Sequence, residues 1–168
     1  MNPIITTDDL CLEYLDNFVL FDGLKKLYPD FKMIAFTIGN FKNKENLATN
    51  ERFLQWYKDR KDWVEIAVHS YDHFEIPDGD REDERGWIEK ALESLKSFLP
   101  EEYGYRSPGW QTTNKTEGIL RDLGFSYIAY ETKIKHFKGQ IIKNVINSHL
   151  YDVNSIKKIY EVLQNNVR

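Results

Sequence analysis

Two histidines follow an apolar run of the chain, and their spacing is that of metal ligands. Residues 64–68 contain three β-branched side chains and have the length of a buried strand, and His69 and His73 come directly after them. Imidazoles bind zinc at roughly 2.0–2.1 Å, and two of them four residues apart reach one cation when a helical turn separates them. The sequence therefore predicts a metal site where this strand ends.

A pair of aspartates ends a second apolar run. Asp8 and Asp9 follow residues 4–7, which read as a strand. Adjacent carboxylates repel each other unless a cation or an arginine compensates their charge. From these residues alone two interpretations stay open, a metal-binding strand end or an N-cap for a helix that begins near Leu10.

An arginine and a third histidine complete the set of candidates. Arg106 precedes Ser107 and Pro108, and a guanidinium can hold an aspartate through two hydrogen bonds, the alternative being an ordinary surface ion pair. His149 ends another strand-like run, and an unperturbed pKa near 6.5 suits a group that both gives and regains a proton. We therefore expect acid–base chemistry beside the metal.

Taken in order, these motifs resemble those of the polysaccharide deacetylase family, also called the NodB homology group or carbohydrate esterase family 4. The resemblance extends from about Ile4 to His149 and rests on Thr6-Thr7-Asp8-Asp9-Leu10, His69-Ser70-Tyr71-Asp72-His73, Arg106-Ser107-Pro108-Gly109 and Ile146-Asn147-Ser148-His149. Leu10 and Gly109 depart from the residues usual in the family. Where the family places an aspartate–tryptophan pair, this chain has His136-Phe137, with Glu131 a few residues earlier.

The resemblance implies a metal-dependent hydrolase that removes N-acetyl, or otherwise O-acetyl, groups from a carbohydrate. It assigns Asp9, His69 and His73 as ligands of one divalent ion, which is zinc, with cobalt and nickel as alternatives. Two imidazoles and one carboxylate leave coordination positions open, as in a catalytic site.

The resemblance also implies the catalytic roles. Asp8 is the general base, Arg106 holds Asp8 ionised and in place, and His149 protonates the leaving amine. Glu131 or His136 is a candidate to orient His149.

Three residues beside the motifs are candidate substrate contacts. The backbone N–H of Gly109 is expected to face the oxyanion, since a main-chain donor needs no side chain. Trp110 and Tyr71 can stack on the apolar face of a sugar ring, although each can equally be packing of the site wall.

Composition limits the class of protein and its partners. The chain has 168 residues, 41% of them hydrophobic and 14% aromatic, which predicts one folded domain over residues 1–168. The 23 Lys and Arg residues are interspersed with 27 Asp and Glu residues, giving a net charge of −4, so we expect no nucleic-acid partner. The oligomeric state stays open.

Targeting features also bear on the expected location. No apolar stretch approaches the roughly 18 residues of a membrane span, and no charged-then-apolar leader stands at the N-terminus, so we expect a cytoplasmic protein without a membrane partner. The single cysteine, Cys11, excludes an intramolecular disulfide and is expected to be a small core residue.

The elements that must position these residues alternate along the chain. The expected strands are residues 3–7, 31–38, 64–68, 103–106, 125–130 and 140–148. The expected helices are residues 15–28, 49–60, 87–99, 113–123 and 154–164, the second capped by Thr49 and the third preceded by a charged, solvated turn over residues 77–85.

Such alternation indicates parallel β-α units in an open sheet or an incomplete barrel. We favour an α/β fold, a single-domain, NodB-like irregular (β/α) barrel of about six to seven parallel strands. Asp8, Asp9, His69, Arg106 and His149 all fall at carboxyl ends of strands, where such a barrel assembles its active site.

Two other functions stay open. The departures at Leu10 and Gly109 and the absent aspartate–tryptophan pair would suit a catalytically impaired carbohydrate-binding module on the same fold. An amidohydrolase or deformylase acting on a non-polysaccharide amide would use the same site, because the chemistry requires only a carbonyl and a leaving amine.

Overall fold

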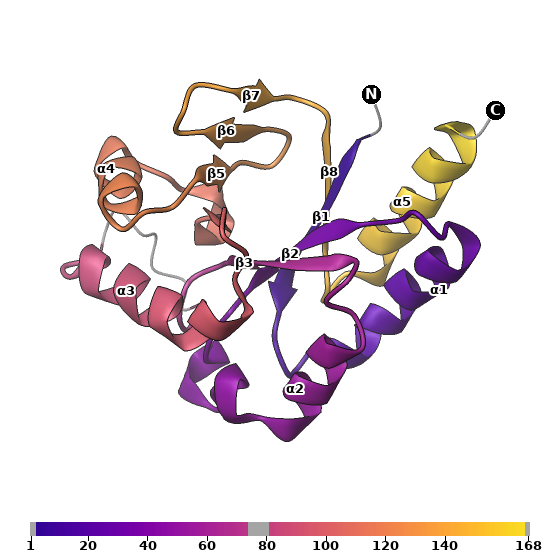
Figure 1. The fold of residues 1–168 in the computed structure, drawn as a ribbon, viewed down its shortest axis with the longest axis horizontal. Coiled ribbons are helices and arrows are strands. Elements are labelled where there is room, and N and C mark those ends of the chain that lie inside the picture. Colours follow the sequence, from indigo (N-terminus) through magenta and orange to yellow (C-terminus); the bar gives the residue numbers. More distant parts are fainter. Residues whose placement is uncertain (1–2, 74–80, 167–168) are drawn as a thin grey trace.

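The computed structural model describes residues 3–73 and 81–166, and there five α-helices cover an eight-stranded sheet (Figure 1). The strands are β1 (Ile4–Leu10), β2 (Met33–Thr37), β3 (Val64–Val68), β4 (Gly104–Tyr105), β5 (Tyr127–Ala129), β6 (Ile134–His136), β7 (Ile141–Ile142) and β8 (Val145–His149). The helices are α1 (Val19–Leu27), α2 (Glu51–Lys58), α3 (Glu84–Leu95), α4 (Asn114–Asp122) and α5 (Val153–Asn166).

The sheet confirms the predicted α/β fold. Its strand order is β7-β6-β5-β4-β3-β2-β1-β8, in which β8 and β1 to β5 run parallel and β6 and β7 pair antiparallel. Within the described residues the sheet is not closed, because β7 and β8 are its two edges. The fold is thus an irregular barrel with six parallel strands and an open seam.

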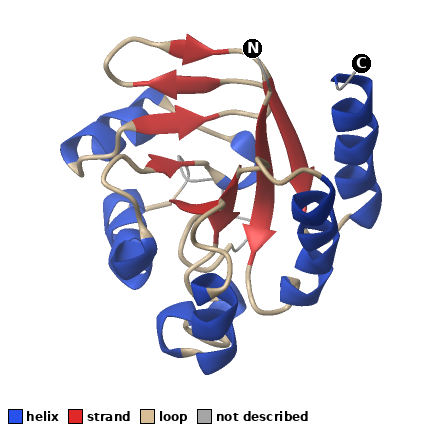
Figure 2. Ribbon diagram, turned by 45° about the vertical axis from the view of Figure 1, so that its right-hand side comes forward, coloured by secondary structure: helices blue, strands red, loops and turns tan. Residues whose placement is uncertain are grey.

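Alternation along the strands separates two apolar layers. On β2, Met33 and Ala35 pack with the helices, whereas Ile34 and Phe36 face the inner side of the sheet. Figure 2 shows the helices placed around the outside of the curved sheet. The inner apolar cluster is smaller and consists of Phe36, Ala67, Tyr127, Ala129, Ile134 and Val145. The inner positions near the carboxyl ends of the strands are polar instead, and the candidate site lies there.

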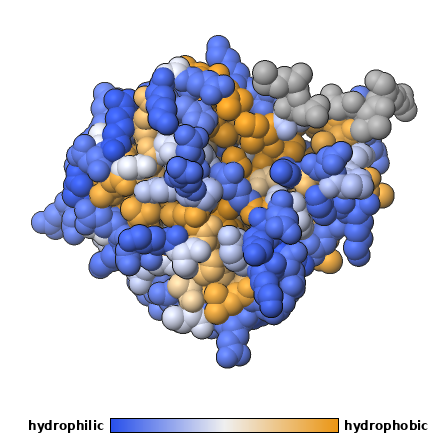
Figure 3. Space-filling view, in the orientation of Figure 1, coloured by the Kyte–Doolittle hydropathy of each residue, from blue (hydrophilic) through white to orange (hydrophobic). Residues whose placement is uncertain are grey.

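The surface of the molecule is mixed in polarity. Figure 3 shows one face with hydrophilic side chains around its rim and hydrophobic ones gathered near its centre. None of the described helices combines the length and the apolar character needed to cross a bilayer. Cys11 is buried as expected, and burial raises the pKa of its thiol to about 11.

Two local expectations need correction. Residues 140–148 form two strands, β7 and β8, and residues 134–136 add a strand that the sequence did not predict, because only Ile134 among them is apolar. Asn50 rather than Thr49 caps α2, since the Asn50 side chain accepts the Phe53 N–H at 3.0 Å. Residues 77–80 of the expected charged turn lie outside the described residues.

The caps and packing of α4 and α5 follow the sequence more closely. Thr113 caps α4 in a capping box with Thr116, as the expected start of that helix requires. Helix α5 lies beside α1 in both ribbon views, where the Tyr160 hydroxyl donates to the Leu20 carbonyl at 2.6 Å. Helix α5 also contacts β8.

Candidate metal centre

A bulge at the end of β1 aims both aspartates at one site. Between Thr7 and Leu10 strand β1 advances three residues while β2 advances two, from 35 to 37, so Asp8 and Asp9 share the space of one residue. Asp9 takes a φ of 66°, a left-handed conformation that aspartate tolerates better than most residues. Neighbouring side chains in a regular strand point to opposite faces, whereas here Asp9 Oδ2 lies 3.2 Å and Asp8 Oδ2 3.8 Å from the same nitrogen, Nδ1 of His149.

His69 is held in the protonation form that a metal ligand needs. It follows β3 directly, is buried, and its Nδ1 lies 2.8 Å from the backbone carbonyl of Arg106. Because a carbonyl only accepts hydrogen bonds, Nδ1 carries a proton, and the lone pair of the neutral ring is on Nε2. That atom faces Asp9 Oδ1 at 3.6 Å.

His73 returns to His69 without the expected helical turn. Residues 70–73 form an irregular bend in which Ser70 and His73 have φ values of 68° and 54°. The bend is fixed by hydrogen bonds from the His73 N–H to Ser70 Oγ at 3.0 Å and from the Asn40 N–H to the Tyr71 carbonyl at 2.6 Å. Left-handed backbone therefore brings the second imidazole back.

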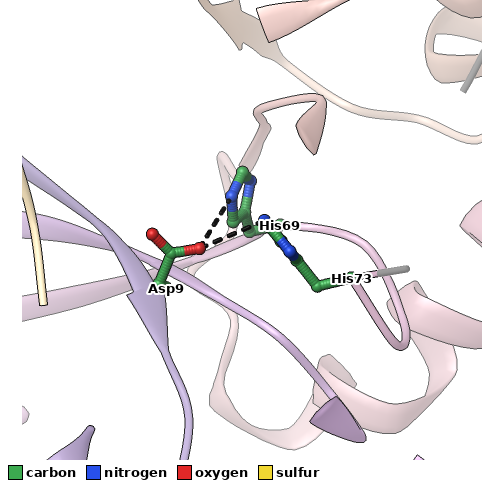
Figure 4. Close-up of side chains that lie close together, drawn as sticks. All are labelled: Asp9, His69 and His73. Carbon is green, nitrogen blue, oxygen red and sulfur yellow. Dashed lines mark ion pairs between the residues drawn. The ribbon is translucent and has the colours of Figure 1, made fainter. Parts of the chain in front are cut away.

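Asp9, His69 and His73 point toward one another in Figure 4. Asp9 Oδ1 is 3.1 Å from His73 Nε2 and 3.6 Å from His69 Nε2, and all three ligand atoms lie within 4.8 Å of one another. Tetrahedral zinc with bonds of roughly 2.0–2.1 Å separates its ligand atoms by about 3.3 Å, close to both distances. The three side chains fit a divalent ion with further coordination positions open.

Asp8 is paired with Arg106 inside the barrel. Arg106 Nη1 donates to Asp8 Oδ1 at 2.5 Å, and the two side chains are 0% and 2% exposed. Arg106 Nη2 donates to the Tyr130 carbonyl at 3.0 Å, and its guanidinium carbon lies 4.0 Å from the centroid of the Phe36 ring. The contact is not an ordinary surface ion pair, because both side chains are buried. Breaking a buried pair leaves an uncompensated charge.

Sequence reasoning missed the second partner of Asp8. Asn147 Nδ2 donates to Asp8 Oδ2 at 2.8 Å, and Asn147 Oδ1 accepts from Arg106 Nη1 and from Thr6 Oγ1, each at 2.7 Å. A signal was present, since Asn147 stands two residues before His149 on β8 and shares its face of the sheet.

His149 has a different partner from the one expected. Its Nδ1 contacts Asp9 Oδ2 at 3.2 Å, so Asp9 takes the place for which the sequence suggested Glu131 or His136. His136 lies on β6, with its ring 5.3 Å from that of Tyr127. Because Nδ1 is engaged, Nε2 is the nitrogen of His149 left to act on a substrate.

The electrostatics of the cluster follow from these contacts. Burial alone would raise the pKa of Asp9, but hydrogen bonds from His149, His69 and His73 lower it well below its usual range. Burial opposes charge on His69, yet the hydrogen bond to Asp9 and the charges of Asp8 and Asp9 raise the pKa of His69. The Asp9 hydrogen bond raises the pKa of His149. A metal ion bound at this site would therefore have to compete with protons.

The three candidate substrate contacts lie in two places. Trp110 packs edge-on to His149, with ring centroids 5.5 Å apart, and both line a cavity of about 270 Å³ with Glu131. Gly109 is exposed beside it with a φ of 60°. Tyr71 instead packs on Trp87, with ring centroids 5.8 Å apart, and its hydroxyl accepts the Asn40 side-chain amide at 3.1 Å. The structure thus groups Trp110, but not Tyr71, with the site.

The chain is similar to known proteins in structure, but comparison of its sequence finds no match. No protein-family sequence model and no curated protein sequence matches the chain. A family 4 carbohydrate esterase from Streptomyces lividans, solved in complex with acetate, superposes with a TM-score of 0.64 at 15% identity, over 97% of this chain and 87% of that one. The chain has the carbohydrate esterase family 4 fold.

Two further structures of the carbohydrate esterase family 4 fold are similar to this chain, and one of them derives from a pseudoenzyme. A mutant of a family pseudoenzyme, with restored enzymatic activity, matches with a TM-score of 0.64 at 17% identity, over 97% of this chain and 62% of that one; the wild type is from Bacillus anthracis. The family 4 domain of a multidomain xylanase from the hindgut metagenome of Trinervitermes trinervoides matches with a TM-score of 0.57 at 17% identity, over 97% and 82%. This chain therefore spans less than two thirds of the pseudoenzyme.

Proposed function

We propose that this protein is a metal-dependent hydrolase that removes N-acetyl, or otherwise O-acetyl, groups from a carbohydrate. One observation carries the proposal. Asp9, His69 and His73 converge on one point, His149 contacts Asp9 at 3.2 Å, and Asp8 lies 3.8 Å from His149. A fold alone requires no such convergence of five ionisable side chains at one rim.

Asp9, His69 and His73 would hold the ion, which we take to be zinc, with cobalt or nickel as alternatives. A bound divalent ion of this kind lowers the pKa of a coordinated water from 15.7 to about 7 and polarises a carbonyl oxygen. The Arg106 carbonyl would orient His69 by keeping the proton on Nδ1, at 2.8 Å.

The chain's own groups would move the protons. Asp8, held by Arg106, would accept a proton from the attacking water as the carbon–oxygen bond forms. His149 would donate a proton from Nε2 to the leaving nitrogen as the carbon–nitrogen bond breaks, while Asp9 engages its Nδ1. The backbone N–H of Gly109, an exposed residue, would stabilise the oxyanion.

The acetylated carbohydrate would lie against Trp110. This indole stands over the cavity shared by His149 and Glu131, so a sugar stacked on it would place its acyl group near the acid. A stacking role for Tyr71 is the less supported part of this proposal, because its described contacts are with Trp87 and Asn40.

Acetate release from a panel of acetylated oligosaccharides tests the proposal. We expect the zinc-loaded parent to release acetate and Asp8→Asn to be about 10²–10⁴-fold slower with the same metal content, since it lacks the base. Asp16→Asn is the control, because this side chain is 90% exposed. No acetate release from any acetylated sugar with zinc, cobalt or nickel would contradict the proposal.

A carbohydrate-binding module is the second candidate function. It is favoured by the carboxylates beside His149 in the described residues, because Nδ1 lies 3.2 Å from Asp9 of the metal set and 3.8 Å from the proposed base Asp8. Calorimetric sugar binding that persists in Asp8→Asn, together with no turnover by the parent, would support this alternative.

A further inference from the structure

Asn147 occupies a central position between the candidate base and its arginine. We propose that Asn147 is a positioning residue that fixes Oδ2 of Asp8 as the oxygen that takes the proton from the attacking water. This inference rests on the proposed function and deepens it. It is carried by the hydrogen bonds of one side-chain amide and by the pairing of β8 with β1.

The chemistry of its partners determines the orientation of the Asn147 amide. Arg106 has only donors, and an ionised Asp8 has only acceptors. Asn147 Oδ1 therefore faces Arg106 Nη1 and the Thr6 hydroxyl, each at 2.7 Å, and Nδ2 faces Asp8 Oδ2 at 2.8 Å. Rotating the amide by half a turn would set donor against donor and acceptor against acceptor, so this arrangement is unique.

The two oxygens of Asp8 have different surroundings. Oδ1 receives Arg106 Nη1 at 2.5 Å. Asp8 Oδ2 accepts a hydrogen bond from Asn147 Nδ2 and lies 3.8 Å from His149 Nδ1. The same nitrogen of His149 contacts Asp9 Oδ2 at 3.2 Å. Oδ2 is thus the oxygen on the side of the metal ligands. In the proposed step the O–H bond of water breaks, its oxygen bonds to the carbonyl carbon, and the proton goes to Oδ2.

Strand pairing explains why Asn147 stands there. Strands β1 and β8 are parallel, with Thr6 opposite Asn147 and Asp8 opposite His149. Alternate residues share a face, so these four side chains form two successive pairs on the inner side of the sheet. The donor to Asp8 and the acid are therefore delivered by the same strand.

An apolar residue of similar size would fill the same space but leave Asp8 Oδ2 without this donor. The hydrogen bonds of the Asn147 side chain are to Thr6, Asp8 and Arg106, not to the metal ligands. Substitution at 147 should therefore separate turnover from metal binding.

The test compares Asn147→Leu and Asn147→Asp with Asn114→Ala, an exposed control on α4. In Asn147→Leu we expect kcat to fall by about 10–100-fold, because misplacement of a reacting group is costly, with KM within about twofold and metal content unchanged. Asn147→Asp should be slower still, since it sets a second carboxylate beside Asp8. Parental kcat in Asn147→Leu, or loss of metal in parallel with activity, would overturn the inference.

A second measurement needs no turnover. In the zinc-loaded protein, the side-chain amide resonances of Asn147 should shift in Thr6→Val and in Asp8→Ala, but not in Glu131→Gln, which alters the same cavity without touching this amide. Resonances that do not respond to Asp8→Ala would overturn the inference even if the parent is active. A parent that releases no acetate but shows these shifts would refute the proposed reaction while supporting the hold of Asn147 on Asp8.

Discussion

The two carboxylate oxygens of Asp9 serve different partners. Oδ1 faces His73 and His69 at 3.1 and 3.6 Å, whereas Oδ2 contacts His149 at 3.2 Å. The neighbouring Asp8 is instead paired with Arg106 through Oδ1, at 2.5 Å. Because of the bulge, two identical adjacent side chains have different partners, which suits the separate roles proposed for them in binding an ion and in moving a proton.

The pH dependence of stability belongs to this scale. Without metal, the pKa values of His69 and His149 are raised by Asp9, so the stability they contribute is full below their unfolded pKa of about 6.5 and is lost as pH rises through the folded values. A metal requires the deprotonated imidazoles of its ligands, His69 and His73, and therefore stabilises the protein more as pH rises. The zinc-induced increase in Tm should therefore grow between about pH 5.5 and 8.

Scanning calorimetry of the metal-free and zinc-loaded protein across that pH range measures this increase. His136→Ala should follow the parent, because His136 lies on β6 outside the ligand set. A zinc-induced shift that is the same at every pH would show that protons do not compete with the ion at these histidines.

At the scale of elements, short strands β4 and β5 carry the inner packing. Gly104 on β4 stands against the Tyr127 ring on β5, and a Cβ built on it would lie 1.9 to 2.3 Å from three ring carbons. Tyr127 is buried, and its hydroxyl donates to Glu65 at 3.0 Å. The absence of a side chain at Gly104 therefore leaves room for this ring inside the barrel.

Replacing this glycine tests the packing. Gly104→Ala should lower the free energy of unfolding by about 1–3 kcal/mol, because the ring must move. Gly118→Ala is the matched control on α4, where an added Cβ meets nothing within 4 Å, and it should raise stability by up to about 1 kcal/mol. Denaturant unfolding measures both, and a neutral Gly104→Ala would contradict the account of the barrel interior.

The periodicity of apolar residues predicts most of the helices and strands, and the motifs are recognised by their position at strand ends. The hydrogen-bond partners of the side chains cannot be predicted in this way. Asp8, Asp9, His69 and His149 are recognisable because ionisable residues seldom follow apolar strands without a reason. The bulge is not visible in sequence, since no glycine marks the left-handed residue, Asp9. The roles of amides such as Asn147 depend on strand pairing, which periodicity does not determine.

On the scale of the whole molecule, one side chain connects several strands across the inside of the barrel. Arg106, which directly follows β4, reaches Thr6 and Asp8 on β1, Asn147 on β8 and the Tyr130 carbonyl just after β5. The sheet is open in its hydrogen bonding, yet its carboxyl rim is joined by a buried guanidinium. The groups of the proposed reaction therefore keep their relative positions without a closed barrel.

Metal content per chain tests the central claim most directly. We would measure it by elemental analysis of the parent, His73→Ala and His136→Ala after incubation with zinc and removal of the excess. The account predicts about one ion per chain in the parent and in His136→Ala, and loss of the ion in His73→Ala. Of these two histidines, His73 is the one that faces Asp9 Oδ1. No ion in the parent, or an ion retained by His73→Ala, would contradict it.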